Sequence, residues 1–164
     1  MEDHMTVIKI LDIKDFTSKL FLGNVFDPFP LVDAHFVTGC IYSIDGHLQS
    51  EYFDTDEKRR FTDENRQFVL WNDMKAYARS IIKGKRLPVQ FRLLFKIPWG
   101  ILDASADVDP SLDGYLNIQY KNNEIICSAD VHANSFTPFA LHASGAGEAI
   151  MSYFRQKEIV CQVL

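Results

Sequence analysis

The stretch NDMKAYARSIIKGKRLPVQFRLLFKIP, residues 72–98, decides the predicted fold because it holds two hydrophobic periodicities in succession. In its first half the apolar residues follow the spacing of an amphipathic helix: Met74, Tyr77, Ala78, Ile81 and Ile82. In its second half they alternate with polar residues, as in a half-buried strand: Val89, Phe91, Leu93, Phe95 and Ile97. We therefore predict a helix capped by Asn72 and ended by Gly84, followed directly by a strand.

The same helix carries a row of basic residues. Lys75, Arg79 and Lys83 recur every four residues roughly opposite the apolar face, and Lys85 and Arg86 follow them. One interpretation is a solvated helix face whose cations, near the helix C-terminus, interact favourably with the helix dipole. The other is an anion-binding surface that contacts the phosphates of nucleic acid or another polyanion. Both stay open, and these five are the predicted binding residues.

The N-terminal residues predict a strand followed by a helix. TVIKIL, residues 6–11, has the pattern of a short strand. Asp12 is a suitable N-cap for the helix that follows, and Gly23 is its expected end. The chain then enters FDPFP, residues 26–30, whose aromatic and proline residues predict a loop that packs into the core or receives a partner.

The next residues predict a hairpin and a loop. The apolar run 31–44 is typical of a strand, and Asp45-Gly46 after it is a strong signal for a tight turn into a second strand over 47–53. The charged residues 54–66 predict a solvated loop. QFVLW, residues 67–71, predicts another short strand just before the helix described above.

Further strands and a helix are predicted after residue 98. Asn122-Asn123 joins two alternating runs and predicts a second hairpin, because asparagine tolerates the left-handed turn conformation. Ser144 is the expected N-cap of a C-terminal helix over 144–157, with a tail or strand after it. The acidic segment 103–113 between the strands is typical of a solvated loop, and whether it binds a cation stays open.

Taken together, these elements predict an α+β fold with an antiparallel sheet. The order is β-α-β-β-β over residues 6–56, the same order over 67–133, and then the C-terminal helix 144–157. This order suggests an internal duplication of one supersecondary unit. A chain of 164 residues with 47% hydrophobic composition is long enough for one buried core, so we expect a single domain over 1–164.

Composition and charge limit the kinds of function. The net charge of −5 excludes a protein that is basic over its whole surface, so any polyanion site has to be local. The three cysteines lie far apart without a CxxC pair, which is typical of a reduced cytoplasmic protein. No apolar run approaches the length of a membrane span, and we expect no membrane association.

Three segments, IKILDIKDFTSKLFLG (8–23), EYFDTDE (51–57) and SIIKGKR (80–86), resemble a family of short, uncharacterised proteins from Firmicutes. That family has no assigned activity, so the resemblance implies no catalytic residue and no cofactor. The doubled β-α-β-β-β order is also similar to one domain of the DNA processivity clamps. This second resemblance implies two helices side by side on one face of a curved sheet, with lysine and arginine directed at DNA. A clamp subunit joins several such domains, and the C-terminal helix has no counterpart there.

Asp130 and His132 give an alternative, enzymatic interpretation. They alternate with Ser128 along one predicted strand and share a face, so a polar cluster is expected there. Alternate strand residues lie roughly 7 Å apart, which is too far for a nucleophile to touch its base directly. The five histidines have no metal-ligand spacing, so we assign no catalytic residue, metal or cofactor.

The functional expectation is a non-enzymatic binding or assembly protein. Its partner is another protein, a second copy of the chain, or nucleic acid bound through the basic helix. The alternative is a small cytoplasmic enzyme with a site around Asp130 and His132. A deep cleft with converging polar groups would favour the enzyme, whereas a smooth sheet with a basic helical face would favour binding.

Overall fold

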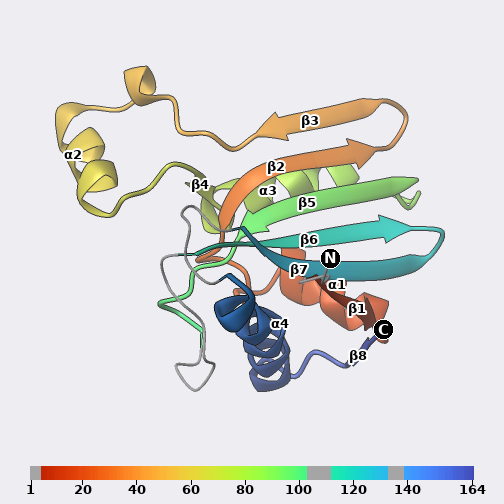
Figure 1. The fold of residues 1–164 in the computed structure, drawn as a ribbon. Helices are drawn as coiled ribbons and strands as arrows, with labels where there is room; N and C mark the ends of the chain where they lie inside the picture. Colours follow the sequence, from red (N-terminus) through yellow and green to blue (C-terminus); the bar gives the residue numbers. More distant parts are fainter. Residues whose placement is uncertain (1–4, 103–111, 133–138) are drawn as a thin grey trace.

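The computed structural model describes residues 5–102, 112–132 and 139–164 and shows an α+β protein (Figure 1). The eight strands among these residues form one antiparallel sheet in the order β3-β2-β5-β6-β7-β1-β8, and β4 pairs with β2. The strands are β1 (Thr6–Ile10), β2 (Pro30–Val37), β3 (Ile41–Asp45), β4 (Val69–Leu70), β5 (Gln90–Lys96), β6 (Asp113–Lys121), β7 (Glu124–His132) and β8 (Cys161–Val163). The helices are α1 (Ile13–Phe21), the 3-10 helix η1 (Ser50–Tyr52), α2 (Thr55–Asp63), α3 (Trp71–Ile82) and α4 (Phe139–Gln156).

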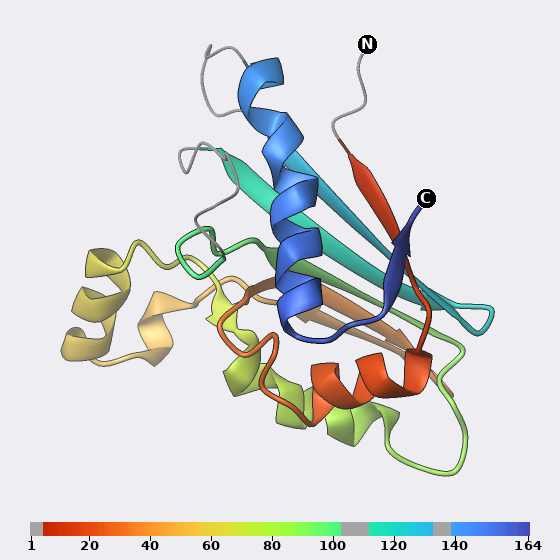
Figure 2. The ribbon, with the colours of Figure 1, turned by 90° about the horizontal axis from the view of Figure 1, so that it is seen from below.

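Helices α1, α3 and α4 cover one face of the sheet, and none of the described helices lies on the opposite face, here called the outer face (Figure 2). The alternation along β5 confirms the predicted strand, since Phe91, Leu93 and Phe95 are buried under the helices. The β6–β7 hairpin is also confirmed, with positive φ at both Asn122 and Asn123. The α+β class with an antiparallel sheet and a C-terminal helix is therefore as predicted.

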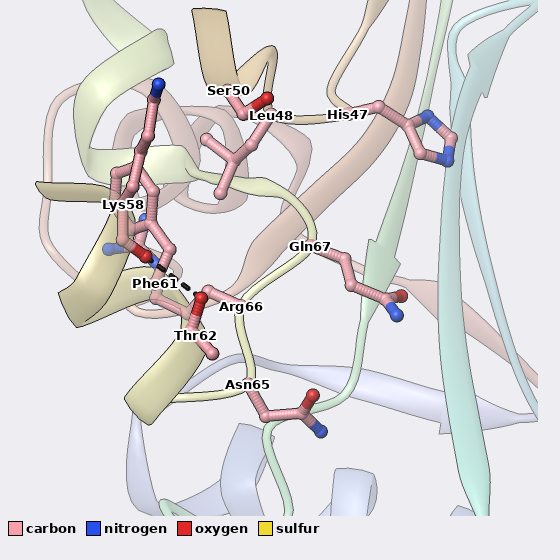
Figure 3. Close-up of a pocket in the computed structure, with 9 residues that line it drawn as sticks. All are labelled: His47, Leu48, Ser50, Lys58, Phe61, Thr62, Asn65, Arg66 and Gln67. Carbon is pink, nitrogen blue, oxygen red and sulfur yellow. Dashed lines mark hydrogen bonds between the residues drawn. The ribbon is translucent and has the colours of Figure 1, made fainter. Parts of the chain in front are cut away.

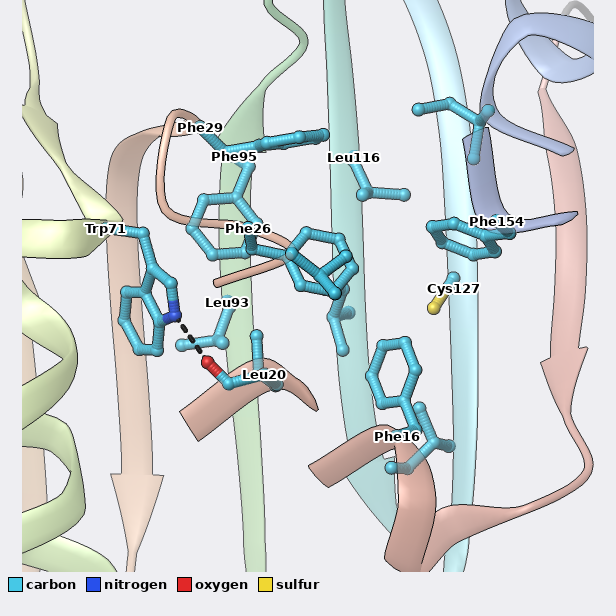
Figure 4. Close-up of a cluster of buried hydrophobic side chains, with 14 of the residues drawn as sticks. Phe16, Leu20, Phe26, Phe29, Trp71, Leu93, Phe95, Leu116, Cys127 and Phe154 are labelled. Atoms are coloured by element: carbon cyan, nitrogen blue, oxygen red, sulfur yellow. Dashed lines mark hydrogen bonds between the residues drawn. The ribbon is translucent and has the colours of Figure 1, made fainter. Parts of the chain in front are cut away.

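The core between sheet and helices contains a connected cluster of aromatic rings among aliphatic side chains (Figure 4). Phe26 touches four of them and is fully buried. Phe29 is also fully buried, so the FDPFP loop packs into the core, which confirms one of its two interpretations. Trp71 is fully buried and donates its indole N–H to the Leu20 carbonyl oxygen at 2.7 Å, which joins α3 to α1.

The predicted cap of α1 is confirmed and that of α3 is wrong. The Asp12 carboxylate accepts the backbone N–H of Asp15 at 3.0 Å. Helix α3 begins one residue before Asn72 and has no side-chain cap. Its first two N–H groups donate instead to the Phe29 and Asp27 carbonyl oxygens, at 2.9 and 3.1 Å, so the loop before β2 does the work of a cap.

The predicted first hairpin is wrong in position. The run 31–44 is two strands, β2 and β3, with their turn at residues 38–40. Asp45-Gly46 ends β3, and 47–53 forms no strand but passes into η1. Gly46 lies so close to β2 that a Cβ there would be 1.7 Å from the Leu31 carbonyl oxygen. Glycine is therefore required here because two backbones lie close together. A tight turn also requires glycine, so the sequence alone does not distinguish the two cases.

The charged segment 54–66 is largely a helix, so the prediction of a loop is wrong. Asp54 and Glu57 form a capping box, in which each side chain accepts the other residue's backbone N–H. The expectation that the segment is solvated holds, because α2 has no buried residue. Together with η1 it forms a projection beyond the end of the sheet (Figure 1), here called the arm, residues 47–68.

The C-terminal helix starts earlier than predicted, because α4 begins at Phe139 and Ser144 falls inside it. The side of α4 that packs into the core is apolar, with Ala149, Ile150 and Phe154 buried. The residues after α4 form β8, which pairs with β1 at one edge of the sheet.

Helices α1 and α3 lie side by side on the same face, and the rings of Phe21 and Trp71 meet at 5.8 Å (Figure 2). This arrangement is the one that the clamp resemblance implies. The first unit, however, has only β2 and β3 after α1, because residues 47–53 form no strand. The two predicted units therefore differ by one strand, and all eight strands belong to one sheet.

Candidate functional site

The five predicted basic residues fall into separate environments. The Lys75 ammonium lies 2.7 Å from the Asp27 carboxylate and donates to the Gly23 carbonyl oxygen at 2.8 Å. Only 16% of its side chain is exposed, against 22% for Asp27. Lys75 therefore ties α3 to the segment after α1. Arg79, one turn later, is half-buried.

Replacing Lys75 with methionine tests this structural role. The change keeps the aliphatic stem but leaves Asp27 without its ammonium partner, so we expect a loss of about 1.5–3 kcal/mol in the free energy of unfolding. Lys14→Met is the matched control, because Lys14 is an exposed residue of α1. For this variant we expect the free energy of unfolding to change by no more than about 0.5 kcal/mol. Urea denaturation measures both, and equal stability of the two variants would contradict the assignment.

The other three basic residues surround a groove of about 560 Å³ at the end of α3. This basic groove is lined by Thr38, Gly39, Ile81, Ile82, Lys83, Gly84, Lys85, Arg86, Leu87 and Val89. Its shape follows from two features. Gly84 has φ 132°, so the chain turns sharply after α3, and Val89 then donates its N–H to the Val37 carbonyl oxygen at 2.8 Å. The 83–88 segment is thereby held beside the β2–β3 turn.

The cations of the basic groove are exposed and lie next to exposed apolar side chains. Lys83, Lys85 and Arg86 form no ion pair with any residue that the structure describes. Leu87 is 79% exposed and Val89 65%. Unpaired cations beside exposed apolar groups can bind a ligand that is both anionic and apolar.

A larger cavity, about 820 Å³, lies inside the arm (Figure 3). Its lining is His47, Leu48, Ser50, Lys58, Phe61, Thr62, Asn65, Arg66 and Gln67. The Arg66 guanidinium lies over the Phe61 ring at 4.9 Å, and its Nε has no hydrogen-bond partner. The sequence did not predict the residues that line this cavity as a site, because the pattern of 54–66 indicates a loop. The Asp54…Glu57 spacing of the capping box was the signal that could have found the helix.

Asp130 and His132 lie together on the outer face, with His132 Nε2 at 3.5 Å from Asp130 Oδ2. The fold adds neighbours that the sequence did not predict: the Tyr115 ring is 5.5 Å from His132, and Lys96 pairs with Asp113 at 3.3 Å. The His132 side chain is 63% exposed, so the pair is open to water. Such a site lacks the desolvated surroundings that strengthen acid–base catalysis.

Comparison with known protein families decides the chain's membership. A family model described as a family of unknown function, DUF5721, matches residues 19–162. The chain belongs to the DUF5721 family. No curated protein and no solved structure matches this DUF5721 chain. The expected uncharacterised family is therefore confirmed, whereas the likeness to a clamp domain stays a prediction.

His, Cys, Asp and Glu side chains are the groups that bind metal ions, and cysteine thiols are possible nucleophiles. Among the side chains that the structure describes, in residues 5–102, 112–132 and 145–164, no group of three or more His, Cys, Asp or Glu is placed to hold a metal ion. Most of the acidic segment 103–113 lies outside these residues. Burial raises the pKa of the Cys127 thiol, which keeps it protonated and unreactive. Among the described helices, none has the length and apolar character required to cross a membrane.

Proposed function

We propose that this DUF5721 protein is a non-catalytic binding protein whose basic groove takes an acidic segment of a protein partner. The observation that carries the proposal is the placement of Lys83, Lys85 and Arg86 around one groove without ion pairs to described residues. Elsewhere on this acidic chain, cations such as Lys9, Lys19 and Lys96 are paired with carboxylates. Three unpaired cations in one place give a local positive potential that attracts a negatively charged partner.

The apolar side chains favour a protein partner over nucleic acid. Roughly half to two-thirds of the hydrogen bonds between protein and DNA go to phosphate and sugar, and these bonds gain nothing from exposed aliphatic groups. Protein interfaces combine an apolar centre with a polar rim. Leu87, Val89 and Ile41, at 79, 65 and 69% exposure, supply apolar surface at this end of the sheet. A segment that combines acidic and aliphatic residues matches both parts of the groove.

Charge reversal tests the proposal. The groove variant carries Lys83→Glu, Lys85→Glu and Arg86→Glu, and the control variant carries Lys14→Glu, Arg59→Glu and Lys157→Glu, at exposed positions that do not line the groove. Both variants change the net charge by the same amount. The probe is a fluorescein-labelled peptide in which Glu and Leu alternate, and fluorescence anisotropy follows its binding. We expect the groove variant to lose at least about tenfold in affinity, which is about 1.4 kcal/mol.

The control variant is expected to bind the peptide within about threefold of the wild type, because none of its three side chains lines the groove and salt screens exposed charges that do not contact the peptide. Added salt should weaken wild-type binding for the same reason. A duplex and a single-stranded oligonucleotide are titrated in parallel. Equal losses in the two variants, or binding of the oligonucleotide in place of the peptide, would overturn the proposal.

A further inference from the structure

Strand β3 is an open edge of the sheet. It pairs with β2 on one side, and no described strand pairs with its other side (Figure 1). Four of its five residues are exposed, and Ile41 and Tyr42 are 69 and 42% exposed. Soluble proteins protect such edges with Pro, Lys, bulges or covering segments, because a free edge is a template for another strand. The sequence of β3, IYSID, has neither Pro nor Lys.

The register of the β2–β3 ladder shows which backbone groups are free. Thr38 donates its N–H to the Cys40 carbonyl oxygen at 2.9 Å, and Gly46 donates to Val32 at 2.8 Å. In an antiparallel ladder, hydrogen-bonded and non-bonded pairs alternate. Between these two bonds, Tyr42 and Ile44 of β3 form the bonded pairs with β2. The alternate residues of β3 therefore direct their N–H and C=O groups outward, and these are Ile41, Ser43 and Asp45.

We propose that a second copy of this chain pairs with β3, antiparallel and symmetric about Ser43. In this register Ser43 faces Ser43 of the second copy, and Ile41 faces Asp45. All three outward-facing residues of each strand then form bonded pairs, so the ladder leaves none of these groups unsatisfied. A shift of the register by two residues in either direction would leave one of the three without a partner. The two sheets would become one continuous sheet across a two-fold axis.

Side-chain chemistry agrees with this register. On the helix-covered face, Tyr42 lies opposite Ile44 of the second copy in a non-bonded pair, where side chains come closest. The two Asp45 carboxylates are offset by four residues, about 13–14 Å along the strands, so they do not repel each other at contact distance. A parallel arrangement in register would place them side by side. The charge pattern therefore favours the antiparallel dimer.

The size of the ladder sets the expected affinity. Five residues a side is a short contact, and interfaces below about 1,000 Å² belong to weak or transient complexes. We therefore expect a micromolar dissociation constant. The opposite edge, β8, spans only Cys161–Val163 and offers a shorter template than β3.

Cysteine cross-linking tests the register directly. Both variants are made in a Cys40→Ser background, because Cys40 is exposed and close to the edge. With Ser43→Cys, the two Cα atoms of a bonded pair lie about 5.5 Å apart, within the range that a disulfide spans. With Ile41→Cys, the same residue in the two copies lies about 13–14 Å apart, beyond that range. We expect mild oxidation to cross-link the first variant and leave the second largely monomeric on a non-reducing gel.

Sedimentation of the wild type over a range of concentration is the second measurement, and we expect a reversible monomer–dimer equilibrium. Ser43→Pro removes an outward N–H and no backbone bond to β2, and the one side-chain bond that it removes, from Ser43 Oγ to His35 Nδ1 at 3.1 Å, is exposed. This variant should therefore remain folded by circular dichroism and sediment as a monomer. Equal cross-linking of the two cysteine variants, or a wild type that stays monomeric at every concentration, would overturn the proposal. Loss of the dimer in the groove charge-reversal variant but not in Ser43→Pro would also overturn it.

Discussion

Replacing Trp71 with alanine is expected to lower the free energy of unfolding by about 3–5 kcal/mol, in the range of large-to-small substitutions in protein cores. Trp71 is fully buried at the start of α3, and its ring meets those of Phe21 and Phe95 at 5.8 and 5.5 Å. The substitution empties this space and leaves the Leu20 carbonyl oxygen without its indole donor. Both effects loosen the contact between α1 and α3.

A second substitution separates the hydrogen bond from the packing. Trp71→Phe keeps an aromatic ring but removes the N–H, so a buried carbonyl loses its partner, at about 1–3 kcal/mol. Trp99→Phe is the matched control, since Trp99 donates its N–H to the Leu112 carbonyl oxygen at 2.8 Å in a half-buried position. Urea denaturation should show the larger loss at Trp71. If Trp71→Ala cost less than about 1 kcal/mol, the described packing of α3 would be incorrect.

Gly46→Ala is expected to destabilise the protein by about 3 kcal/mol, at the upper end of overpacking effects. The added Cβ would lie 1.7 Å from the Leu31 carbonyl oxygen, which is a backbone atom and has no rotamer by which to move away. Relief of the clash requires β2 and the start of the arm to separate. That separation would break the bonds from Gly46 N–H to Val32 and from Val69 N–H to Gly46, both 2.8 Å.

Gly39→Ala is the control for this substitution, because a Cβ at Gly39 meets nothing within 4 Å. Gly39 lies in the turn between β2 and β3, so both substitutions affect the same hairpin. We expect Gly39→Ala to change stability by less than about 0.5 kcal/mol, as for an ordinary surface substitution. Thermal unfolding of the two variants measures the difference. Equal melting temperatures would mean that Gly46 does not approach β2 as described.

Gly46 also shows why part of the fold could not be predicted from the sequence. A tight turn and a close approach between two backbones both require glycine, and the choice depends on a partner strand that sequence patterns do not show. Local periodicity was enough for β5 and for the hairpin at Asn122 and Asn123, because each depends on neighbouring residues alone. The start of α3 was misplaced because loop carbonyls, and no side chain, accept its first N–H groups.

The basic residues of the candidate site could be predicted from the sequence, but which of them lie together in space could not. The repeat of basic residues along α3 is visible in the sequence. The sequence does not show that Lys75 forms an ion pair with Asp27, 48 positions earlier in the chain, and so does not lie at the groove. The basic groove exists because Val89 bonds to Val37, a contact between strands that the sequence placed in different units. The arm cavity was missed because a charged segment was interpreted as a loop, although Asp54 and Glu57 carry the capping-box spacing.

The most direct test of the basic groove as the binding surface is amide chemical-shift mapping of the isotope-labelled protein during titration with the alternating Glu-Leu peptide. We predict that the largest shifts occur at Thr38, Gly39 and residues 83–89, and that the groove charge-reversal variant loses them. Shifts concentrated in the arm or around Asp130 and His132, with residues 83–89 unchanged, would contradict the account.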